Sequence, residues 1–177
     1  APVITTSEGK GAIPETHRLS MGSSSYGWGA GGDIVPKSDV ILAVGSRLGS
    51  YRPEPGAQPG SAQKLINLNI DPTEFGKTAP AAVGVAADAK VGLRQLITAL
   101  RSRAVKSSWD HKELAGIKEQ SWERMKAKAP KQVAALQDMR NAIPEDGFIV
   151  SGITNMGAWS TIAFDALKPR TYITSSY

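Results

Sequence analysis

The middle of the chain contains the apolar run Val40-Ile41-Leu42-Ala43-Val44-Gly45. An uninterrupted apolar stretch of this length, closed by glycine, is typical of a β-strand that is buried on both faces. Further strands are predicted at residues 64–71 and 83–86, and residues 89–100 place their apolar side chains on one face of a helix. Strands joined by connections of this length indicate a parallel sheet with crossover helices. The predicted fold class is therefore α/β, a parallel sheet flanked by helices.

Further elements are predicted on both sides of this region. Strand patterns occur at residues 3–6, 148–151 and 171–174, and a helix is predicted at residues 132–140. An apolar stripe at approximate helical spacing, ended by Pro130, favours core packing over the binding of a partner helix; it consists of Trp109, Leu114, Ile117, Trp122 and Met125. A complete domain rarely begins and ends within its own pattern. We therefore expect the chain to be a fragment of a longer protein.

Composition excludes several classes of protein. Of the 177 residues, 41% are hydrophobic and 21% are charged, which is typical of globular domains. The absence of cysteine excludes a disulfide scaffold, a thiolate metal site and a cysteine nucleophile. No apolar run is long enough to predict a membrane span, and the first residues lack the pattern of a signal peptide. These features predict a soluble protein of a reducing compartment, the cytoplasm.

The net charge of +5 is concentrated in one region. Residues 101–131 carry nine Lys or Arg residues and four Asp or Glu residues, a difference equal to the whole net charge. Such a region can bind nucleic acid, and a basic adaptor is one hypothesis. The acids, however, interleave with the cations at helical spacing, which favours a solvated helix and linker. We expect no nucleic-acid partner.

The sequence contains no complete catalytic constellation. It lacks a Walker A motif and a G-x-S-x-G elbow, and its only histidines are His17 and His111. Two histidines without clustered carboxylates disfavour a zinc or di-iron site. Residues 27–32 satisfy G-x-G-x-x-G, but a Ser- and Gly-rich stretch precedes them where a dinucleotide-binding motif follows a buried strand. The dinucleotide interpretation is therefore disfavoured.

The ends of the apolar strands are better candidates for a binding site. Ligands of open parallel sheets bind beyond the carboxyl ends of the strands, and the polar or glycine residues there are Gly45, Arg47, Asn69, Asp71 and Asp88. Arg47 could pair with a phosphate, and an acidic residue could accept hydrogen bonds from ribose hydroxyls. Asp71 and Asp88 could equally cap helices. The two roles are compatible, and both stay open.

Several motifs resemble those of thiamine-diphosphate-dependent enzymes, most closely the acetolactate synthase branch. Residues 2–17 resemble the family's P-V-x-T-T-x-x-G-K-G-x-x-P-E-x-H stretch, and residues 69–77 resemble D-I-D-P-x-E-I-G-K. Residues 38–47 and 87–89 match two further motifs in the expected order. The resemblance implies a Rossmann-like central domain at residues 1–105 without its first strand–helix unit. It implies a linker with an amphipathic helix at 106–130 and the start of the diphosphate-binding domain at 131–177.

The C-terminal part carries the second half of this resemblance. Residues 152–159 align with the family's G-V-G-Q-H-Q-M-W, with Asn155-Met156 in place of Gln-His, and residues 168–175 align with K-P-R-x-x-x-T-S. The resemblance implies that Thr154, Asn155, Met156 and Ser175 lie on the diphosphate side of the cofactor. It implies thiamine diphosphate and Mg²⁺ in the parent enzyme, and allows FAD or ADP at the strand ends of the central domain. It assigns no catalytic residue and no metal ligand to this chain.

The function implied is that of a carboligase or decarboxylase acting on 2-oxo acids, a transferase or lyase. The resemblance implies that this chain is inactive alone and that it works with its own missing pyrimidine and diphosphate domains in a homo-oligomer. The expected substrate is a small molecule, and no nucleic-acid or membrane partner is expected. The alternative is a stand-alone Rossmann-like domain that binds FAD, ADP or NAD.

Overall fold

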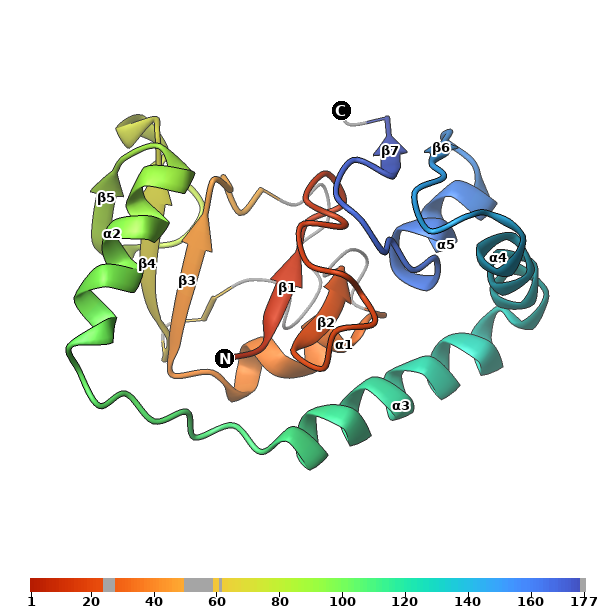
Figure 1. Ribbon diagram of the computed structural model, residues 1–177, viewed down its shortest axis with the longest axis horizontal. Coiled ribbons are helices and arrows are strands. Elements are labelled where there is room, and N and C mark those ends of the chain that lie inside the picture. Colours follow the sequence, from red (N-terminus) through yellow and green to blue (C-terminus); the bar gives the residue numbers. More distant parts are fainter. Residues whose placement is uncertain (24–27, 50–58, 61, 176–177) are drawn as a thin grey trace. The chain divides into compact units, whose positions relative to one another are not determined.

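The computed structural model describes residues 1–23, 28–49, 59–60 and 62–175. The chain divides into two compact units, one formed by Ala1–Ile34 together with Trp109–Tyr177 and the other by Val35–Ser108. Every strand pair in the described residues is parallel, and helices accompany the strands of each unit (Figure 1), so the predicted α/β class is confirmed. Within the described residues, no helix has the length and apolar character needed to cross a membrane.

The second unit contains the three strands predicted in the middle of the chain. Its elements are η2 (Val35–Lys37), β3 (Val40–Val44), β4 (Lys64–Asn69), η3 (Pro72–Glu74), β5 (Ala81–Ala86) and α2 (Ala89–Arg101), where η denotes a 3₁₀ helix. The strands form one parallel sheet in the order β3-β4-β5. The predicted strands and the predicted helix at residues 89–100 are confirmed. Consecutive parallel strands bring their carboxyl ends to the same edge of the sheet.

The prediction that β3 is buried on both faces is wrong for one face. The side chains of Val40 and Leu42 are 53% and 40% exposed. The strand register places Val83 and Val85 of β5 on the same face, and both are exposed as well. One face of this sheet therefore presents aliphatic side chains to solvent.

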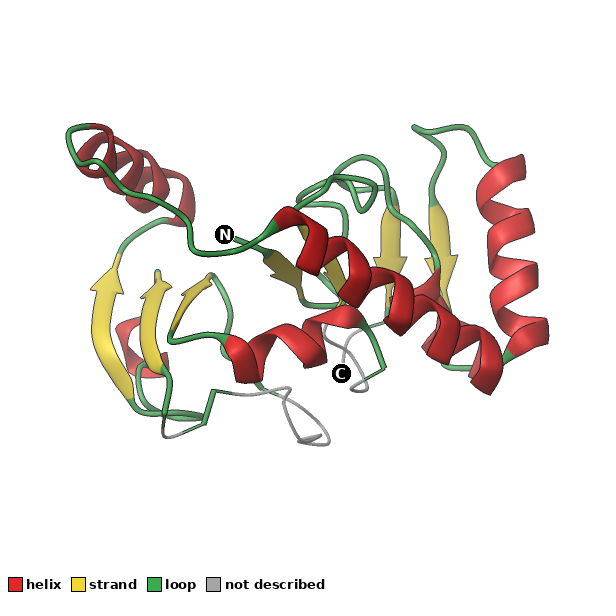
Figure 2. Cartoon of the chain, turned by 90° about the horizontal axis from the view of Figure 1, so that it is seen from below, coloured by secondary structure: helices red, strands yellow, loops and turns green. Residues whose placement is uncertain are grey.

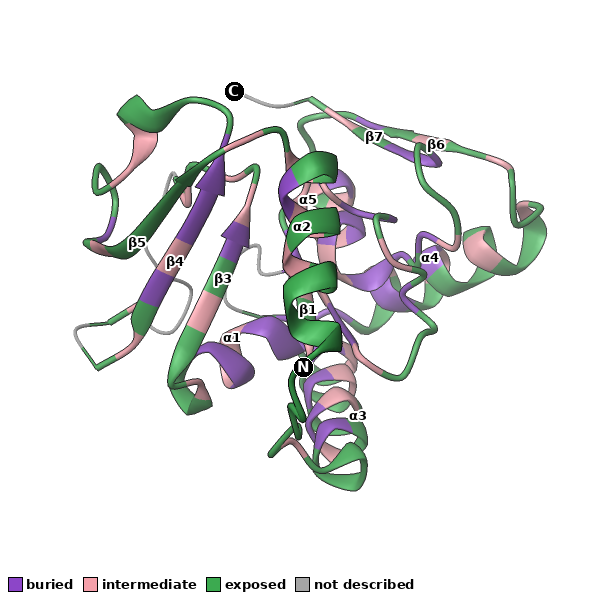
Figure 3. Ribbon diagram, turned by 60° about the vertical axis from the view of Figure 1, so that its left-hand side comes forward, coloured by how far each residue is buried: buried purple, intermediate pink, exposed green. Residues whose placement is uncertain are grey.

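The arrangement of α2 explains this exposure. The helix touches the sheet closely at Gly92, which packs against Leu68 near the carboxyl end of β4. Figure 3 shows α2 mostly as exposed and β4 as largely buried. On the opposite face, Ala43 and Leu65 form a small core with Ala79. β3 and β4 are thus buried at Ala43 and Leu65 on one face and covered only locally on the other, and β5 is exposed along most of its length.

The first unit contains the remaining strands and helices. Its elements are β1 (Val3–Thr5), β2 (Ser20–Ser23), α1 (Ala30–Ile34), α3 (His111–Lys128), α4 (Pro130–Ala142), β6 (Ile149–Ser151), α5 (Asn155–Ala163) and β7 (Tyr172–Thr174). The strands form two parallel pairs, β1-β2 and β6-β7. The strands predicted near residues 3–6, 148–151 and 171–174 are confirmed.

Helix α3 carries the predicted apolar stripe, and the stripe packs in the core. Leu114 and Ile117 belong to a buried cluster with residues of β2 and α1, and Met125 belongs to a second cluster with α4, α5 and β7. The predicted break at Pro130 is also confirmed, because α3 ends at Lys128 and α4 begins at the proline. Figure 2 shows the two helices meeting at a bend. The core-packing hypothesis is therefore confirmed.

The predicted domain boundaries and the G-x-G-x-x-G motif need separate comment. Packing groups residues 1–34 with residues 109–177, whereas the resemblance implies domain boundaries near residues 105 and 130. A division by packing does not test a division by family architecture, so those boundaries stay a prediction. The expectation that only a Ser- and Gly-rich loop precedes the G-x-G-x-x-G motif is wrong, because the mostly buried strand β2 ends at Ser23. The motif begins at Gly27, which lies outside the described residues, and α1, which begins at Ala30 within the motif, has only five residues. A dinucleotide-binding motif opens a longer helix.

Candidate functional site

The predicted diphosphate loop follows β6, and Ser175 follows β7. The two strands pair in parallel with Ser151 opposite Thr174, so residues 152–156 and Ser175 leave the sheet at the same edge. Thr154 is the N-cap of α5, and its Oγ1 accepts a hydrogen bond of 2.9 Å from the backbone N–H of Gly157. The structure therefore brings together the two segments that the sequence places on the diphosphate side.

The side chains of this loop have distinct surroundings. Asn155 Oδ1 accepts a 3.0 Å hydrogen bond from Gln132 Nε2 of α4, which orients the first residue of α5. Met156 is half-buried against the hydrophobic cluster of α4, α5 and β7, and Ser175 is exposed. Sequence reasoning proposed Met156 as a cofactor-binding residue, and the structure assigns its side chain a packing role; its backbone N–H remains part of the first helical turn.

The chemistry of this edge fits an anionic group. The first backbone N–H groups of a helix have no acceptor within the helix, and the helix dipole favours negative charge there. A side chain at Gly157 would collide with the carbonyl of Gly152, so the first turn of α5 lies directly against the loop backbone. This close approach keeps the loop backbone at the helix N-terminus. Within the part of the chain that the structure describes, no group of three or more His, Cys, Asp or Glu could hold a metal ion.

The second set of candidates lies at the carboxyl edge of β3-β4-β5. Asn69 joins the neighbouring segments, because its Nδ2 donates to the carbonyl of Ser46 (3.4 Å) and its Oδ1 accepts from the backbone N–H of Asp71 (3.1 Å). Gly45 has φ = +60°, a left-handed conformation that favours glycine for backbone reasons. Arg47 is exposed, and its carbonyl accepts a 2.9 Å bond from the hydroxyl of Thr78.

The two aspartates at this edge cap helices. Asp71 Oδ1 accepts hydrogen bonds from Thr73 N (2.9 Å) and Thr73 Oγ1 (2.7 Å), and these bonds lower the pKa of Asp71. Asp88 Oδ1 accepts from the backbone N–H of Val91 at 3.0 Å, at the start of α2. The capping hypothesis is confirmed for both residues. A ligand role for this set of residues stays a prediction.

Sequence reasoning missed a buried ion pair in the first unit. Lys10 Nζ lies 2.6 Å from both carboxylate oxygens of Glu15, and the two side chains are 1% and 3% exposed. Glu15 also pairs with Ala166: its Oε2 accepts from Ala166 N at 2.7 Å, and its own N–H donates to Ala166 O at 3.1 Å. Burial raises the pKa of Glu15, although Lys10 opposes that effect. The sequence feature that could have predicted this pair is the motif that contains Lys10 and Glu15, five residues apart. Lys and Glu are rarely buried unless they are paired, so burial of this motif would imply an ion pair.

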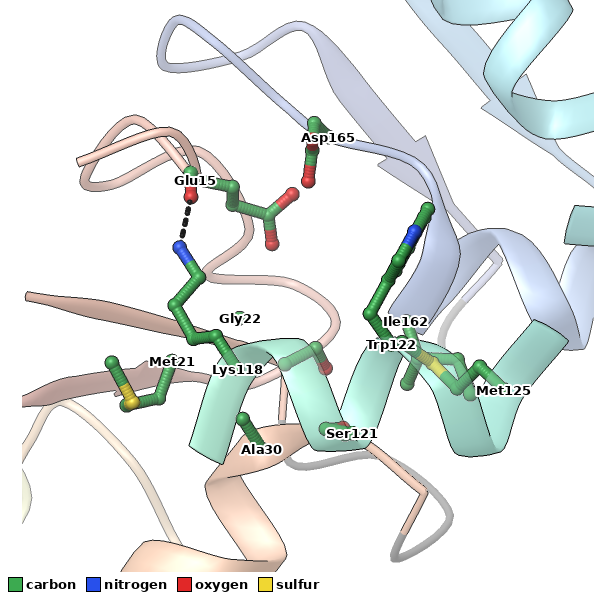
Figure 4. A pocket seen from close by; sticks show the side chains of 12 residues that line it. Glu15, Met21, Gly22, Ala30, Lys118, Ser121, Trp122, Met125, Ile162 and Asp165 are labelled. Carbon is green, nitrogen blue, oxygen red and sulfur yellow. Dashed lines mark hydrogen bonds between the residues drawn. The ribbon is translucent and has the colours of Figure 1, made fainter. Parts of the chain in front are cut away.

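An open cleft lies beside Glu15, the acid of this ion pair (Figure 4). It is lined by residues of the first unit, among them Glu15, Lys118, Trp122 and Asp165. Lys118 Nζ donates to the backbone carbonyl of Glu15 at 3.0 Å, so the lysine is tied to the same segment as the ion pair. None of the predicted cofactor-binding residues lines this cleft. The cleft and the diphosphate edge are therefore separate features of the unit.

Comparison with known proteins identifies the family. Residues 1–96 match the family described as thiamine pyrophosphate enzyme, central domain; thiamine pyrophosphate is another name for thiamine diphosphate. The chain belongs to the thiamine pyrophosphate enzyme family. The match includes β1 to β5 and most of α2, so it covers both the N-terminal motif and the three-stranded sheet. The resemblance inferred from the sequence is confirmed.

Curated members of the thiamine pyrophosphate enzyme family match the C-terminal part as well. A probable 2-ketoarginine decarboxylase from Pseudomonas aeruginosa is 29% identical over 179 residues, which cover 98% of this chain and 31% of that protein. A probable acetolactate synthase large subunit from Methanocaldococcus jannaschii is 28% identical, with 98% and 31% coverage. A sulfoacetaldehyde acetyltransferase from Roseovarius nubinhibens is 30% identical, with 88% and 30% coverage. The chain thus spans less than a third of the length of these enzymes.

Family membership bears on the strand edge at β6-β7 and on the alternative of a stand-alone nucleotide-binding domain. A thiamine pyrophosphate enzyme takes thiamine diphosphate as its cofactor. The strand edge that carries Thr154 and Ser175 has hydrogen-bond donors suited to an anionic group, and its assignment to the diphosphate stays a prediction. The matches support the thiamine-diphosphate interpretation and give no support to a stand-alone FAD- or NAD-binding domain.

Proposed function

We propose that the protein containing this chain is a thiamine-diphosphate-dependent carboligase or decarboxylase that acts on 2-oxo acids. This chain contributes the central domain and the beginning of the diphosphate-binding domain, and it is inactive without the rest of the protein. The observation that carries the proposal is the match of residues 1–96 to the family's central domain, followed by a parallel β6-β7 pair whose carboxyl edge carries the diphosphate motif.

The proposal assigns the diphosphate to the loop at residues 154–156. The backbone N–H groups of Asn155 and Met156 would donate to its oxygens, and the hydroxyls of Thr154 and Ser175 would add polar contacts from the two strand ends. When bound, the cofactor would supply the ylid and carbanion chemistry that makes or breaks a bond at a carbonyl carbon. This chain's residues bind and orient the diphosphate end. Mg²⁺ accompanies the diphosphate in the proposal, and no residue of this chain is assigned to it.

The matched relatives support the reaction class and leave the substrate open. Their names include a decarboxylase, a synthase and an acetyltransferase. Bond making or breaking next to a carbonyl is common to these reactions, and it is the chemistry of the cofactor. In the proposal a small 2-oxo acid is the substrate, and the pyrimidine domain and the rest of the diphosphate domain come from the same protein, a cytoplasmic homo-oligomer. No nucleic-acid or membrane partner is proposed.

A nucleotide in the central domain is a finer proposal. The carboxyl edge of β3-β4-β5 gathers Arg47, Asn69 and Asp71 around the ends of neighbouring strands, which supports the binding of FAD or ADP there. The capping bonds of Asp71 and Asp88 leave one carboxylate oxygen of each without an assigned cap, so capping does not prevent ligand contact. Extraction of the purified full-length protein and chromatography of the released nucleotide tests this point.

The main proposal is tested by calorimetric titration of the full-length protein with thiamine diphosphate and Mg²⁺. We expect one cofactor per subunit, and we expect Thr154→Val to weaken binding about tenfold, because the cap that orders the loop is lost. Thr161→Val is the matched control, since it removes a hydroxyl from the same helix away from the loop. A panel of 2-oxo acids then distinguishes the reactions: a decarboxylase releases an aldehyde, and a carboligase forms a new carbon–carbon bond. Absence of cofactor binding by the wild type contradicts the proposal.

A further inference from the structure

A buried chain of hydroxyl groups connects β7 to the first turn of α5. The hydroxyl of Tyr172 lies 2.8 Å from Ser160 Oγ, and Ser160 Oγ donates to the carbonyl of Gly157 at 2.7 Å. Ser151 Oγ lies 3.2 Å from Ser160 Oγ and 3.4 Å from the same carbonyl. Tyr172, Ser160 and Ser151 are all buried. This chain of hydroxyl groups therefore ends on the backbone carbonyl of Gly157, in the first turn of α5.

The number of hydroxyl protons indicates which group donates and which accepts in each of these hydrogen bonds. Ser160 has one hydroxyl proton, and the shortest bond to an obligate acceptor is the one to the carbonyl of Gly157. Either hydroxyl can donate in the bond between Tyr172 and Ser160, and with the Ser160 proton directed to Gly157 it is Tyr172 that donates. Burial raises the pKa of Tyr172, so its hydroxyl keeps the proton that this bond needs. The sequence of donation is Tyr172 to Ser160 to Gly157.

Gly157 is held from both sides. Its carbonyl receives the hydroxyl chain, and its N–H donates to Thr154 Oγ1 at 2.9 Å. Because the first turn lies against the carbonyl of Gly152, a shift of Gly157 must also move residues 152–156. The hydroxyl chain thus acts on the predicted diphosphate loop through one residue.

Tyr172, at the β7 end of the hydroxyl chain, is held in place by the N-terminal segment. Lys10 Nζ lies 5.5 Å from the centroid of the Tyr172 ring, and the ring of Phe164 lies 6.4 Å from that of Tyr172. Lys10 is fixed by its buried pair with Glu15, which in turn holds the backbone of Ala166. The N-terminal segment therefore fixes the strand from which the hydroxyl chain starts.

We propose that Tyr172 and Ser160 are positioning residues that order the diphosphate loop at residues 152–156 for cofactor binding. The inference rests on the proposed function, because it assigns the loop to the diphosphate. Removing one hydroxyl of a bonded, buried pair costs stability wherever the pair lies, so a loss of stability alone would not distinguish a role in the loop from a role in the core. The bonds here end on the backbone of the loop-bearing turn, and this location predicts an effect on the loop itself.

The test uses the full-length protein with Tyr172→Phe and Ser160→Ala, which remove the hydroxyls and keep most of the packing. Thr161→Val is the matched control, because Thr161 Oγ1 donates to Ala158 O at 2.7 Å within the same helix and takes no part in the hydroxyl chain. In the cofactor-free protein, we expect both test variants to raise amide hydrogen exchange in residues 152–157 about three- to tenfold, and the control to leave it unchanged.

The second measurement is the affinity for thiamine diphosphate. We expect the dissociation constants of Tyr172→Phe and Ser160→Ala to rise about three- to tenfold, while KM for the 2-oxo acid at saturating cofactor stays within twofold. Unchanged hydrogen exchange in residues 152–157 overturns the inference, and so does faster exchange with wild-type cofactor affinity. Wild-type protein that does not bind thiamine diphosphate overturns the proposed function, and the inference with it, before any variant is compared.

Discussion

The buried ion pair of Lys10 and Glu15 gives a sharp test of how the first unit is held together. Lys10→Met leaves a buried carboxylate without its cation, and Glu15→Gln leaves a buried ammonium without its anion, at side chains that are 1% and 3% exposed. Removing one partner of such a pair costs about 3–5 kcal/mol of the free energy of unfolding. We expect each single variant to lose that amount in urea denaturation of the chain followed by circular dichroism.

The double variant Lys10→Met/Glu15→Gln separates charge pairing from simple loss of packing. It removes both charges, and the amide oxygen of Gln can still accept the hydrogen bond from Ala166 N. A buried ion pair is often worth no more than neutral groups of similar volume, so we expect the double variant to lie within about 2 kcal/mol of the wild type. Lys126→Met is the control, because the Lys126–Glu123 pair is exposed and should be worth less than about 1 kcal/mol. Additive losses in the double variant would refute the reasoning.

Three more outcomes are expected. Burial raises the pKa of Glu15 above its usual 4.5, so its stabilising contribution is complete below about pH 4.5 and is lost as pH rises through the raised pKa. Glu15→Gln cannot titrate, so this component of the pH dependence should be missing from its pH-dependent melting, and its persistence would contradict the assignment. Gly157→Ala should destabilise by more than about 3 kcal/mol because its methyl meets a backbone carbonyl, whereas in Gly92→Ala it meets only the end of a leucine side chain, and equal effects on thermal melting would contradict this. The isolated chain should self-associate through the open sheet face, and Val83→Thr/Val85→Thr should reduce its apparent mass in light scattering; a monomeric wild type would contradict this expectation.

The secondary structure could be predicted because its causes are local. The apolar run at residues 40–45, the stripe of α3 and the break at Pro130 are patterns of neighbouring residues, and each produced the expected strand, helix or helix end. Aspartate before Pro72 and before α2 likewise predicted caps that the structure contains. The family motifs are short runs as well, and the match of residues 1–96 confirms them.

The candidate site could be predicted only in part. The sequence placed Thr154 and Ser175 on the diphosphate side, and the parallel pairing of β6 with β7 brings their segments to one edge. It did not predict that the side chain of Met156 packs in the core, because a motif specifies a position and not the direction of its side chain. The expected burial of β3 failed for a similar reason: an apolar run shows which side chains favour burial, and α2 covers the sheet only near Gly92.

The sequence by itself determined the α/β class, most of the strands and longer helices, and the family, because periodicity, turn residues and short motifs act over a few neighbouring positions; it did not predict β2, which lies in a Ser- and Gly-rich stretch. Tertiary structure alone decided that Lys10 and Glu15 are buried together and that Glu15 holds Ala166, 151 residues away. The same is true of the bonds from Tyr172 through Ser160 to Gly157. Such contacts depend on which distant segments exclude water together, and the desolvation of a charge or hydroxyl exists only once the chain has packed around it.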